Sequence, residues 1–286
     1  PLMAVAEDGN GEVHAHLLAL ICRHGRLFPP YLYTHGRVYG EGEYAPGEDR
    51  ELLFSMMLKA VTQKFNHKLC LYIEFSDISN KMFAYRHFRQ SGYFPIPWQE
   101  IHNSLHSLPP EKRISEKALS KIETAEKHGV YTREAESEEE LGAFYKLLRS
   151  YFRFKTRRSI PHRKMFSMLN SEGDSKTFVT IYKNKIIGGC VCLYSGKNAY
   201  MWYLASKRKT YIHLSPASIT VWAAIKYAYT HGYEHIYFLD AGLPFRNNPF
   251  REFILSFGGK PVSKYRWFRL PVPYINRFLS WCYNDK

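Results

Sequence analysis

Hydrophobic residues follow two different periods along the chain, and together they predict alternating helices and strands. The segment EDRELLFSMMLKAVTQKF repeats apolar positions at helical spacing, so we expect an amphipathic helix there. LCLYIEF, at 69–75, is a short apolar run of the kind that forms a buried strand. Residues 1–21 hold two apolar runs around a Gly/Asn/Asp turn, which predicts a hairpin.

The second half carries the fuller pattern. A charged segment that ends at Gly129 predicts a single connecting helix. Ser137 and Glu140 have the spacing of a capping box, which starts another helix. After that helix we expect, in order, a hairpin in KTFVTIYKNKIIGGCVCLY, a strand in NAYMWYLAS, a helix over 215–231, a strand in HIYFLDAG, a helix in NPFREFILSF and a strand in KPVSKYRWFRL.

The two halves resemble each other in element order. LYIEF at 71–75 corresponds to IYFLD at 236–240, and HFRQSGYFP at 87–95 corresponds to FILSFGGKP at 253–261. We therefore predict an α/β (α+β) fold of two tandem units, with mixed, mostly antiparallel sheets flanked by helices. The expected parts are 1–108, a first unit lacking its initial strand and helices, then the connecting helix 109–128, and the second unit 129–286.

Composition narrows the classes of partner. The 286 residues are 45% apolar, and 40 Lys+Arg against 26 Asp+Glu give a net charge of +14. Such an excess favours RNA, nucleotide phosphates or a phospholipid surface as partners. Five cysteines without a C-x-x-C pair support neither a disulfide framework nor a zinc ribbon, so we expect a cytoplasmic protein. His14 and His16 share a strand face without a third ligand, and no metal site is predicted.

Five motifs between 114 and 261 carry a family resemblance. They are ISEKALSKIETAEKHGV, SEEELGAFYKLLRSYFRF, AYMWYLAS, SPASITVWAAIKYAYTHGYEHIYFLDAG and FREFILSFGG. This segment resembles the GNAT acyltransferase unit. Two such units joined by a charged helix resemble the FemAB-like family, the aminoacyl-tRNA-dependent peptidyltransferases of cell-wall synthesis and their relatives.

The resemblance implies an acyltransferase that forms an amide by moving an activated acyl or aminoacyl group to an amine acceptor. It implies no permanently bound cofactor, aminoacyl-tRNA as the donor and a peptidoglycan precursor as the acceptor. The chain departs from its relatives in two ways. Ile254 stands where many carry a lysine, and the connector is one helix where tRNA-using relatives often have an inserted helical hairpin.

The stretch WYLASKRKTYIHLSPAS, at 202–218, is the first candidate site. A GNAT unit places a glycine-rich loop between this strand and this helix, so that backbone N–H groups reach the pyrophosphate of coenzyme A. Residues 206–214 contain no glycine, and we expect Ser215 to cap the helix instead. Lys207, Arg208 and Lys209 would bind phosphate through their side chains. This favours aminoacyl-tRNA over acyl-CoA as the donor.

The second candidate is a basic stretch at 141–170 that contains no acidic residue. Arg153, Arg157 and Arg158 would bind a phosphorylated, nucleotide-linked or lipid-linked acceptor, or tRNA, because arginine forks match phosphate oxygens. DNA is not expected as a partner. The alternative interpretation is a solvated helix face.

Three residues are candidates for the chemistry itself. Asp240 ends a strand, where it would accept a proton from the attacking amine; the alternative is a turn-capping aspartate. Tyr203 precedes the basic loop, where an exposed backbone N–H would polarise the acyl carbonyl; the alternative is core packing. Glu252 is the third, with a surface salt bridge as its alternative. Arg246 and Arg251 would replace the missing lysine as phosphate contacts.

Two other functions remain open at this point. One is an acyl-CoA-dependent N-acyltransferase that acts on a sugar or lipid acceptor. The other is a non-catalytic protein that binds anionic ligands, including a membrane surface. No apolar run reaches membrane-spanning length, so we expect the cytoplasm, at or near the inner face of the membrane.

Overall fold

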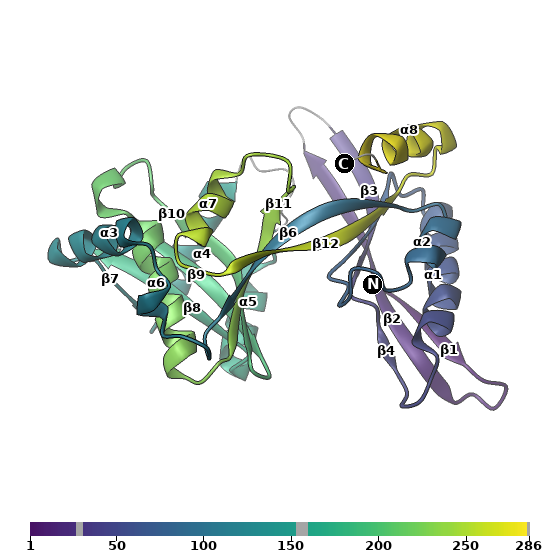
Figure 1. Ribbon diagram of the computed structural model, residues 1–286, viewed down its shortest axis with the longest axis horizontal. Coiled ribbons are helices and arrows are strands. Elements are labelled where there is room, and N and C mark those ends of the chain that lie inside the picture. The colour runs from purple at the N-terminus through teal and green to yellow at the C-terminus, as the bar shows by residue number, and fades with distance from the viewer. Residues whose placement is uncertain (27–30, 153–159, 285–286) are drawn as a thin grey trace. The chain divides into compact units, whose positions relative to one another are not determined.

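The computed structural model describes residues 1–26, 31–152 and 160–284, and it divides into two compact units (Figure 1). Unit 1 combines Pro1–Trp98 with Ser263–Lys286, and unit 2 is the continuous stretch Gln99–Val262. These boundaries differ from the expected 1–108, 109–128 and 129–286. The physical reason is that the chain returns to unit 1 after residue 262, where it adds a strand to that unit's sheet.

Unit 1 is a sheet with two helices against one face. Its strand order is β1 (Leu2–Glu7), β2 (Val13–Arg26), β3 (Tyr31–Tyr39), β5 (Ile73–Ser76) and β12 (Lys260–Arg269), with β4 (Glu43–Tyr44) paired to β2. All described pairs are antiparallel except β3–β5. Helices α1 (Arg50–His67) and α2 (Tyr85–Gln90) supply Phe54, Phe65 and Phe88 to a core that includes Trp267 of β12.

Unit 2 has the strand order β6 (Phe94–Ser104, of which residues 94–98 belong to unit 1), β11 (His235–Gly242), β10 (Asn198–Ser206), β9 (Lys185–Ser195), β8 (Ser175–Tyr182) and β7 (Tyr131–Glu134). The β10–β11 pair is parallel and the others are antiparallel. Its helices are α3 (Glu116–Lys127), α4 (Glu138–Phe152), α5 (Arg163–Glu172), α6 (Pro216–Thr230) and α7 (Pro249–Leu255), with short turns of 3-10 helix at Pro110–Lys112 and Ile212–Leu214. The predicted fold class, mixed and mostly antiparallel sheets flanked by helices, is confirmed.

Two adjacent glycines in β9 show how helices cover both faces of this sheet. A Cβ added to Gly188 would lie 3.1 Å from Thr220 Oγ1 of α6, and one added to Gly189 would lie 2.6 Å from the Phe144 ring of α4. Successive residues of a strand point to opposite faces. Helix α6 therefore covers one face and α4 the other, and both approach β9 closely because no side chain stands between.

The start of α4 is held as the sequence predicts, with one difference. Ser137 Oγ accepts a hydrogen bond from the Glu140 N–H at 3.3 Å. The Glu140 carboxylate accepts from the Glu136 N–H rather than from Ser137, and it also binds the Arg133 guanidinium of β7 at 2.7 Å and 2.8 Å. This arginine lowers the pKa of the Glu140 carboxyl. Helix α4 is thus tied to the edge of the sheet.

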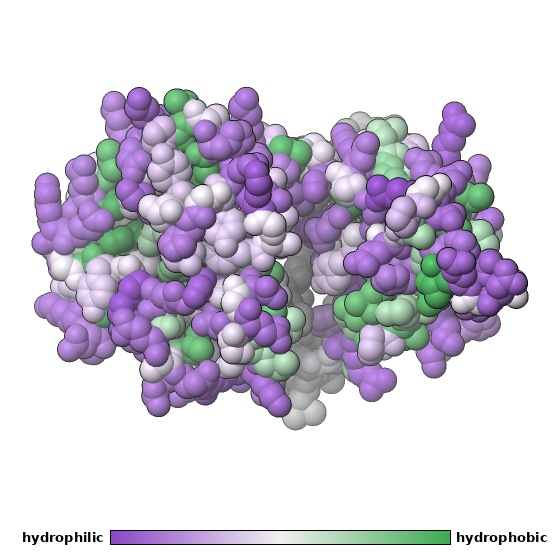
Figure 2. Space-filling model, turned by 90° about the horizontal axis from the view of Figure 1, so that it is seen from below, coloured by the Kyte–Doolittle hydropathy of each residue, from purple (hydrophilic) through white to green (hydrophobic). Residues whose placement is uncertain are grey.

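Polar side chains cover most of the face seen in Figure 2, with hydrophobic residues in small groups. None of the helices that the structure describes is long and apolar enough to cross a membrane. Cys190 and Cys192 of β9 are fully buried and form no disulfide.

We predict that Gly189→Ala destabilises the protein. The new methyl group would meet the Phe178 carbonyl oxygen at 2.5 Å as well as the Phe144 ring, so backbone or ring must move. Overpacking of this kind costs about 1–3 kcal/mol, measured as the change in the free energy of unfolding. Gly9→Ala is the matched control, because nothing lies within 4 Å of its added Cβ. Equal stability of the two variants would contradict the close packing of α4 on β9.

Candidate functional site: the divergence of two parallel strands

The candidate site lies where β10 and β11 stop pairing with each other. Their parallel pairing runs from Asn198–His235 to Met201–Phe238 and ends there. Beyond that point β10 continues along β9 to Ser206, and a shift of register between Met201 and Tyr203 leaves Trp202 as a bulge. β11 continues along β6 through its own irregularity between Phe238 and Gly242. Two neighbouring strands therefore separate, each held by its other neighbour.

Such a separation has a chemical consequence. The backbone N–H and C=O groups of a central strand normally form hydrogen bonds with both neighbouring strands. Past Met201 and Phe238, β10 and β11 no longer form parallel pairs with each other. The point where two neighbouring strands separate is a place where an extended ligand can bind or a carbonyl can be polarised. Bulges often occur beside active sites, where they change the direction of the chain.

The basic loop follows directly at the end of β10. Lys207 donates its N–H to the Ile187 carbonyl at 2.8 Å, which holds the loop against β9. The side chains of Lys207, Arg208 and Lys209 are exposed, and Leu214 is buried under the short 3-10 turn. The three predicted phosphate-binding cations thus stand together between the divergence point and α6, available to a ligand from solvent.

The expected helix cap at Ser215 is wrong. Ser215 has the left-handed backbone conformation, with φ 42°, and its side chain accepts no hydrogen bond from the first turn of α6. Its carbonyl oxygen instead accepts from the Ser218 N–H at 2.8 Å. The first turn also holds no acidic residue. The partial positive charge of this helix start is therefore not compensated by a cap or a carboxylate.

Tyr203 is placed in the core rather than at a surface. Its ring is 3% exposed and packs edge-on against Phe152 and Phe166, with centroids 6.0 Å and 5.8 Å away. Neighbouring Trp202 is half-buried beside it. This is the packing interpretation that the sequence left open. The predicted role of a backbone N–H at Tyr203 in polarising the acyl carbonyl remains a prediction, and the backbone around the neighbouring Trp202 lies at the divergence point.

Four predicted residues lie outside what the structure describes. Arg153, Arg157 and Arg158 belong to the segment 153–159, and for Asp240 only the backbone is described, within the irregular part of β11. Their proposed roles in binding and proton transfer remain predictions.

The side chain of Arg251, in α7, binds backbone carbonyl groups of the protein. Its side chain is 13% exposed, and the guanidinium donates to the carbonyl oxygens of Leu243 at 2.9 Å and Arg246 at 3.0 Å. It therefore ties down the loop that follows β11. Its Nε lies 3.8 Å from Oε1 of Glu252, whose side chain is 65% exposed. This agrees with the alternative interpretation of Glu252, a surface salt bridge. Arg246 is exposed and better placed for a solvent-borne phosphate.

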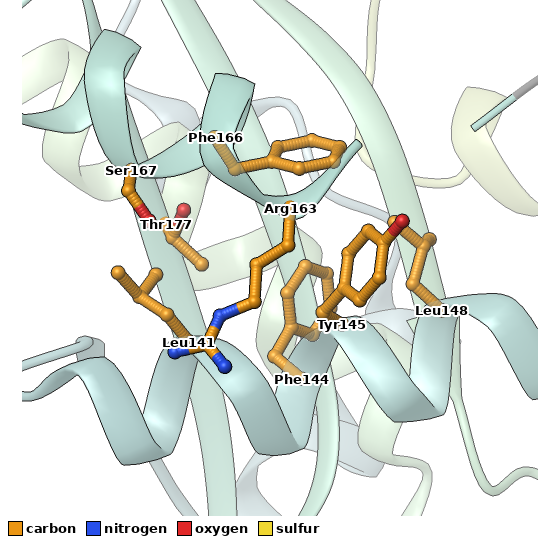
Figure 3. A pocket seen from close by; sticks show the side chains of 8 residues that line it. All are labelled: Leu141, Phe144, Tyr145, Leu148, Arg163, Phe166, Ser167 and Thr177. Carbon is orange, nitrogen blue, oxygen red and sulfur yellow. The ribbon is translucent and has the colours of Figure 1, made fainter. Parts of the chain in front are cut away.

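The described pocket lies on the opposite face of the sheet from α6. It is lined by Leu141, Phe144, Tyr145, Leu148, Arg163, Phe166, Ser167 and Thr177, from α4, α5 and β8 (Figure 3). Arg163 belongs to the predicted basic stretch, but its guanidinium donates to the Glu138 carbonyl and carboxylate oxygens, each at 2.8 Å. This charge is already neutralised, and none of the candidate catalytic or phosphate-binding residues named from the sequence lines the pocket.

Sequence reasoning missed one cluster of potential ligands, His106, Glu234 and His235. The adjacent pair is visible in the sequence, but His106 lies far from it along the chain. Only the pairing of β6 with β11 brings the three together.

Comparison with known protein families gives a match to the middle of the chain. Residues 112–247 match the family described as Acetyltransferase (GNAT) domain. The match includes the divergence point, the basic loop and α6. No curated protein sequence is significantly similar to the chain.

Solved structures share the fold over nearly the whole chain. L-PGS from Bacillus licheniformis has a TM-score of 0.64 at 12% identity, covering 98% of this chain and 89% of that one. FemX has a TM-score of 0.62 at 13% identity, with 98% and 90% covered. A tandem GNAT protein from the clavulanic acid biosynthesis pathway has a TM-score of 0.59 at 12% identity, with 94% and 84% covered. These likenesses confirm the predicted FemAB-like, tandem GNAT fold.

We predict that Arg251→Met lowers the free energy of unfolding by about 1–3 kcal/mol, because the two loop carbonyls lose a charged donor. Arg246→Met is the control, because only the backbone carbonyl of Arg246 takes part in the contact and the substitution leaves that carbonyl in place. This variant should change the free energy of unfolding by less than about 0.5 kcal/mol. Chemical denaturation measures both. A large loss in Arg246→Met with none in Arg251→Met would contradict the anchoring role.

Proposed function

We propose that this protein transfers an aminoacyl group to an amine acceptor and forms an amide bond, because residues 112–247 match the acetyltransferase (GNAT) domain family. The observation that carries the proposal is the glycine-free basic loop at the divergence of β10 and β11. It supports a donor whose phosphates are bound by side chains.

The donor proposed is aminoacyl-tRNA. A pyrophosphate can approach the backbone closely only where glycine leaves room for it, and the segment 206–214 contains no glycine. Lys207, Arg208 and Lys209 offer three exposed cations instead, which suits a polyphosphate backbone. The second candidate donor is acyl-CoA, favoured by the GNAT domain itself and by the uncapped start of α6. No permanently bound cofactor is needed for either.

The reaction proposed is a direct displacement. The acceptor nitrogen attacks the acyl carbonyl carbon and forms the C–N bond, while the bond to the donor's ester oxygen, or thioester sulfur, breaks. Backbone N–H groups near Trp202 stabilise the negative charge on the carbonyl oxygen. Asp240 takes the proton from the amine, and the leaving group takes a proton in turn. The protein mainly holds the two reactants in line.

The acceptor proposed is a phosphorylated, nucleotide-linked or lipid-linked amine of the cell envelope, such as a peptidoglycan precursor. The fold likeness to FemX and L-PGS supports this class without selecting a member. Arg153, Arg157 and Arg158 are the proposed phosphate contacts of the acceptor, with Arg246 near the end of β11. A sugar or lipid acceptor for an acyl-CoA donor is the corresponding alternative.

We predict that the triple variant Lys207→Ala/Arg208→Ala/Lys209→Ala raises KM for the true donor about tenfold or more, with a reduced salt dependence, because three phosphate contacts are lost. Lys117→Ala/Lys121→Ala/Lys127→Ala removes three exposed lysines from α3 and is the charge-matched control. Amide formation is measured with aminoacyl-tRNA and with acyl-CoA. Unchanged KM in the loop variant would remove the loop from the donor site. Binding of anionic ligands without turnover of either donor would favour the non-catalytic alternative.

We also propose that the protein works at the inner surface of the membrane. Helix α8 (Pro273–Asn284) is fixed to unit 1 by Asn276, which donates to the Gly92 carbonyl at 2.9 Å, and by Tyr283, which stacks on Phe94. Its other face exposes apolar side chains, with Tyr274 83%, Phe278 60% and Trp281 65% exposed. An exposed face of aromatic residues is typical of helices that lie in a lipid interface.

We predict that vesicles containing anionic phospholipid sediment the wild-type chain, and that Phe278→Ser/Trp281→Ser reduces the bound fraction at least about threefold. The control Met3→Ser/Met82→Ser removes two other exposed apolar side chains of unit 1 and should bind as the wild type does. Equal binding of both double variants would show that α8 does not contact the lipid.

A further inference from the structure

One group of metal-ligating side chains lies away from the proposed acyl-transfer site. His106, Glu234 and His235 each offer one ligand atom, and these atoms all lie within 4.8 Å of one another. All three belong to unit 2. His235 begins β11, directly opposite Ser104 at the end of β6, and His106 follows two residues later. The cluster is therefore at the far end of β11 from the divergence point.

The backbone at this cluster is firmly held. The Glu234 carbonyl oxygen accepts from the Leu105 N–H at 2.7 Å, and the Glu234 N–H donates to the Lys197 carbonyl at 2.8 Å. The start of β11 is thereby fixed to both of its neighbours at the position of the ligands. A metal site needs such preorganised positions, because each free ligand would otherwise have to be ordered on binding.

The surroundings of His106 also fit a metal ligand. Its Nδ1 lies 3.2 Å from the Glu234 carbonyl oxygen. When Nδ1–H donates to that oxygen, Nε2 keeps the lone pair that a metal requires. Metal-binding histidines commonly have this second hydrogen bond to a carbonyl or carboxylate, which fixes the tautomer and the ring orientation.

We propose that His106, Glu234 and His235 form a binding site for one divalent transition-metal ion of the zinc class. Two imidazoles and a carboxylate are a ligand set that zinc accepts, with water as the fourth ligand. In a tetrahedral zinc site the ligand atoms stand about 3.4 Å apart. Side-chain rotations of the exposed His106 and the half-buried Glu234 and His235 would close the remaining distance.

Lys197 competes for the same carboxylate. Its ammonium binds the Glu234 carboxylate, so the lysine occupies an oxygen that a metal ion would need. The Lys197 side chain is 75% exposed, and an exposed ion pair of this kind contributes little to stability. The metal would displace the lysine into solvent. It would then join the end of β6 to the start of β11 as a fixed link.

The test is zinc titration of the untagged, EDTA-treated full chain by calorimetry, with cobalt spectra as a second readout of coordination. The wild type is expected to bind one zinc ion with a Kd in the micromolar range and to gain thermal stability. His106→Ala and His235→Gln should each weaken binding at least about tenfold. Lys197→Ala should bind at least as tightly as the wild type, because it removes the competitor.

His128→Ala is the matched control. His128 is also exposed and also has Nδ1 near a backbone carbonyl, that of Thr124, but it is not part of the cluster. It should leave zinc affinity unchanged. Because His106 is exposed, its alanine variant should fold normally, and its melting temperature without metal checks this. The proposal is overturned when the wild type shows no saturable binding of zinc, cobalt or nickel, or when His106→Ala and His235→Gln bind zinc as the wild type does.

Discussion

The end of the pairing between β10 and β11 is the constraint on which the candidate site depends. Four parallel residue pairs bring the strands together, and beyond Met201 and Phe238 each strand follows its other neighbour. The bulge at Trp202 makes this possible, since it lets β10 stay with β9 while turning from β11. Gly188 and Gly189 of β9 allow α6 and α4 to pack closely against the two faces of the sheet. Because each strand stays paired with its other neighbour, the separation is present without a ligand.

Much of this arrangement could be predicted from the sequence. Apolar periodicity and the turn residues gave the order of helices and strands in unit 2, because these signals are local. The strand, basic loop and helix start at 202–218 are found where they were expected. The FemAB-like resemblance then supplied the fold, which the comparisons confirm.

The features that sequence reasoning missed depend on backbone conformations and hydrogen-bond partners that residue types alone do not reveal. Ser215 has the composition of a helix cap, yet its left-handed backbone turns the hydroxyl away from that role. Arg251 appears in the sequence as a free cation, but it is committed to two carbonyl oxygens of a loop that precedes it. Arg163 is likewise neutralised by Glu138. Net charge therefore overstates the number of cations that remain for phosphate, and Lys207, Arg208 and Lys209 gain importance by comparison.

The return of β12 to unit 1 also has a consequence for the order of folding. Trp267 is completely buried in the core of unit 1, and it pairs with Phe75, which lies far earlier in the chain. During synthesis, residues 1–98 emerge first but lack this strand until unit 2 has been made. Unit 2 is one continuous segment and has no such delay. Until then, the edge of β5 that later pairs with β12 has no partner strand. Unit 1 can therefore complete its sheet only after β12, its last strand, has been synthesised.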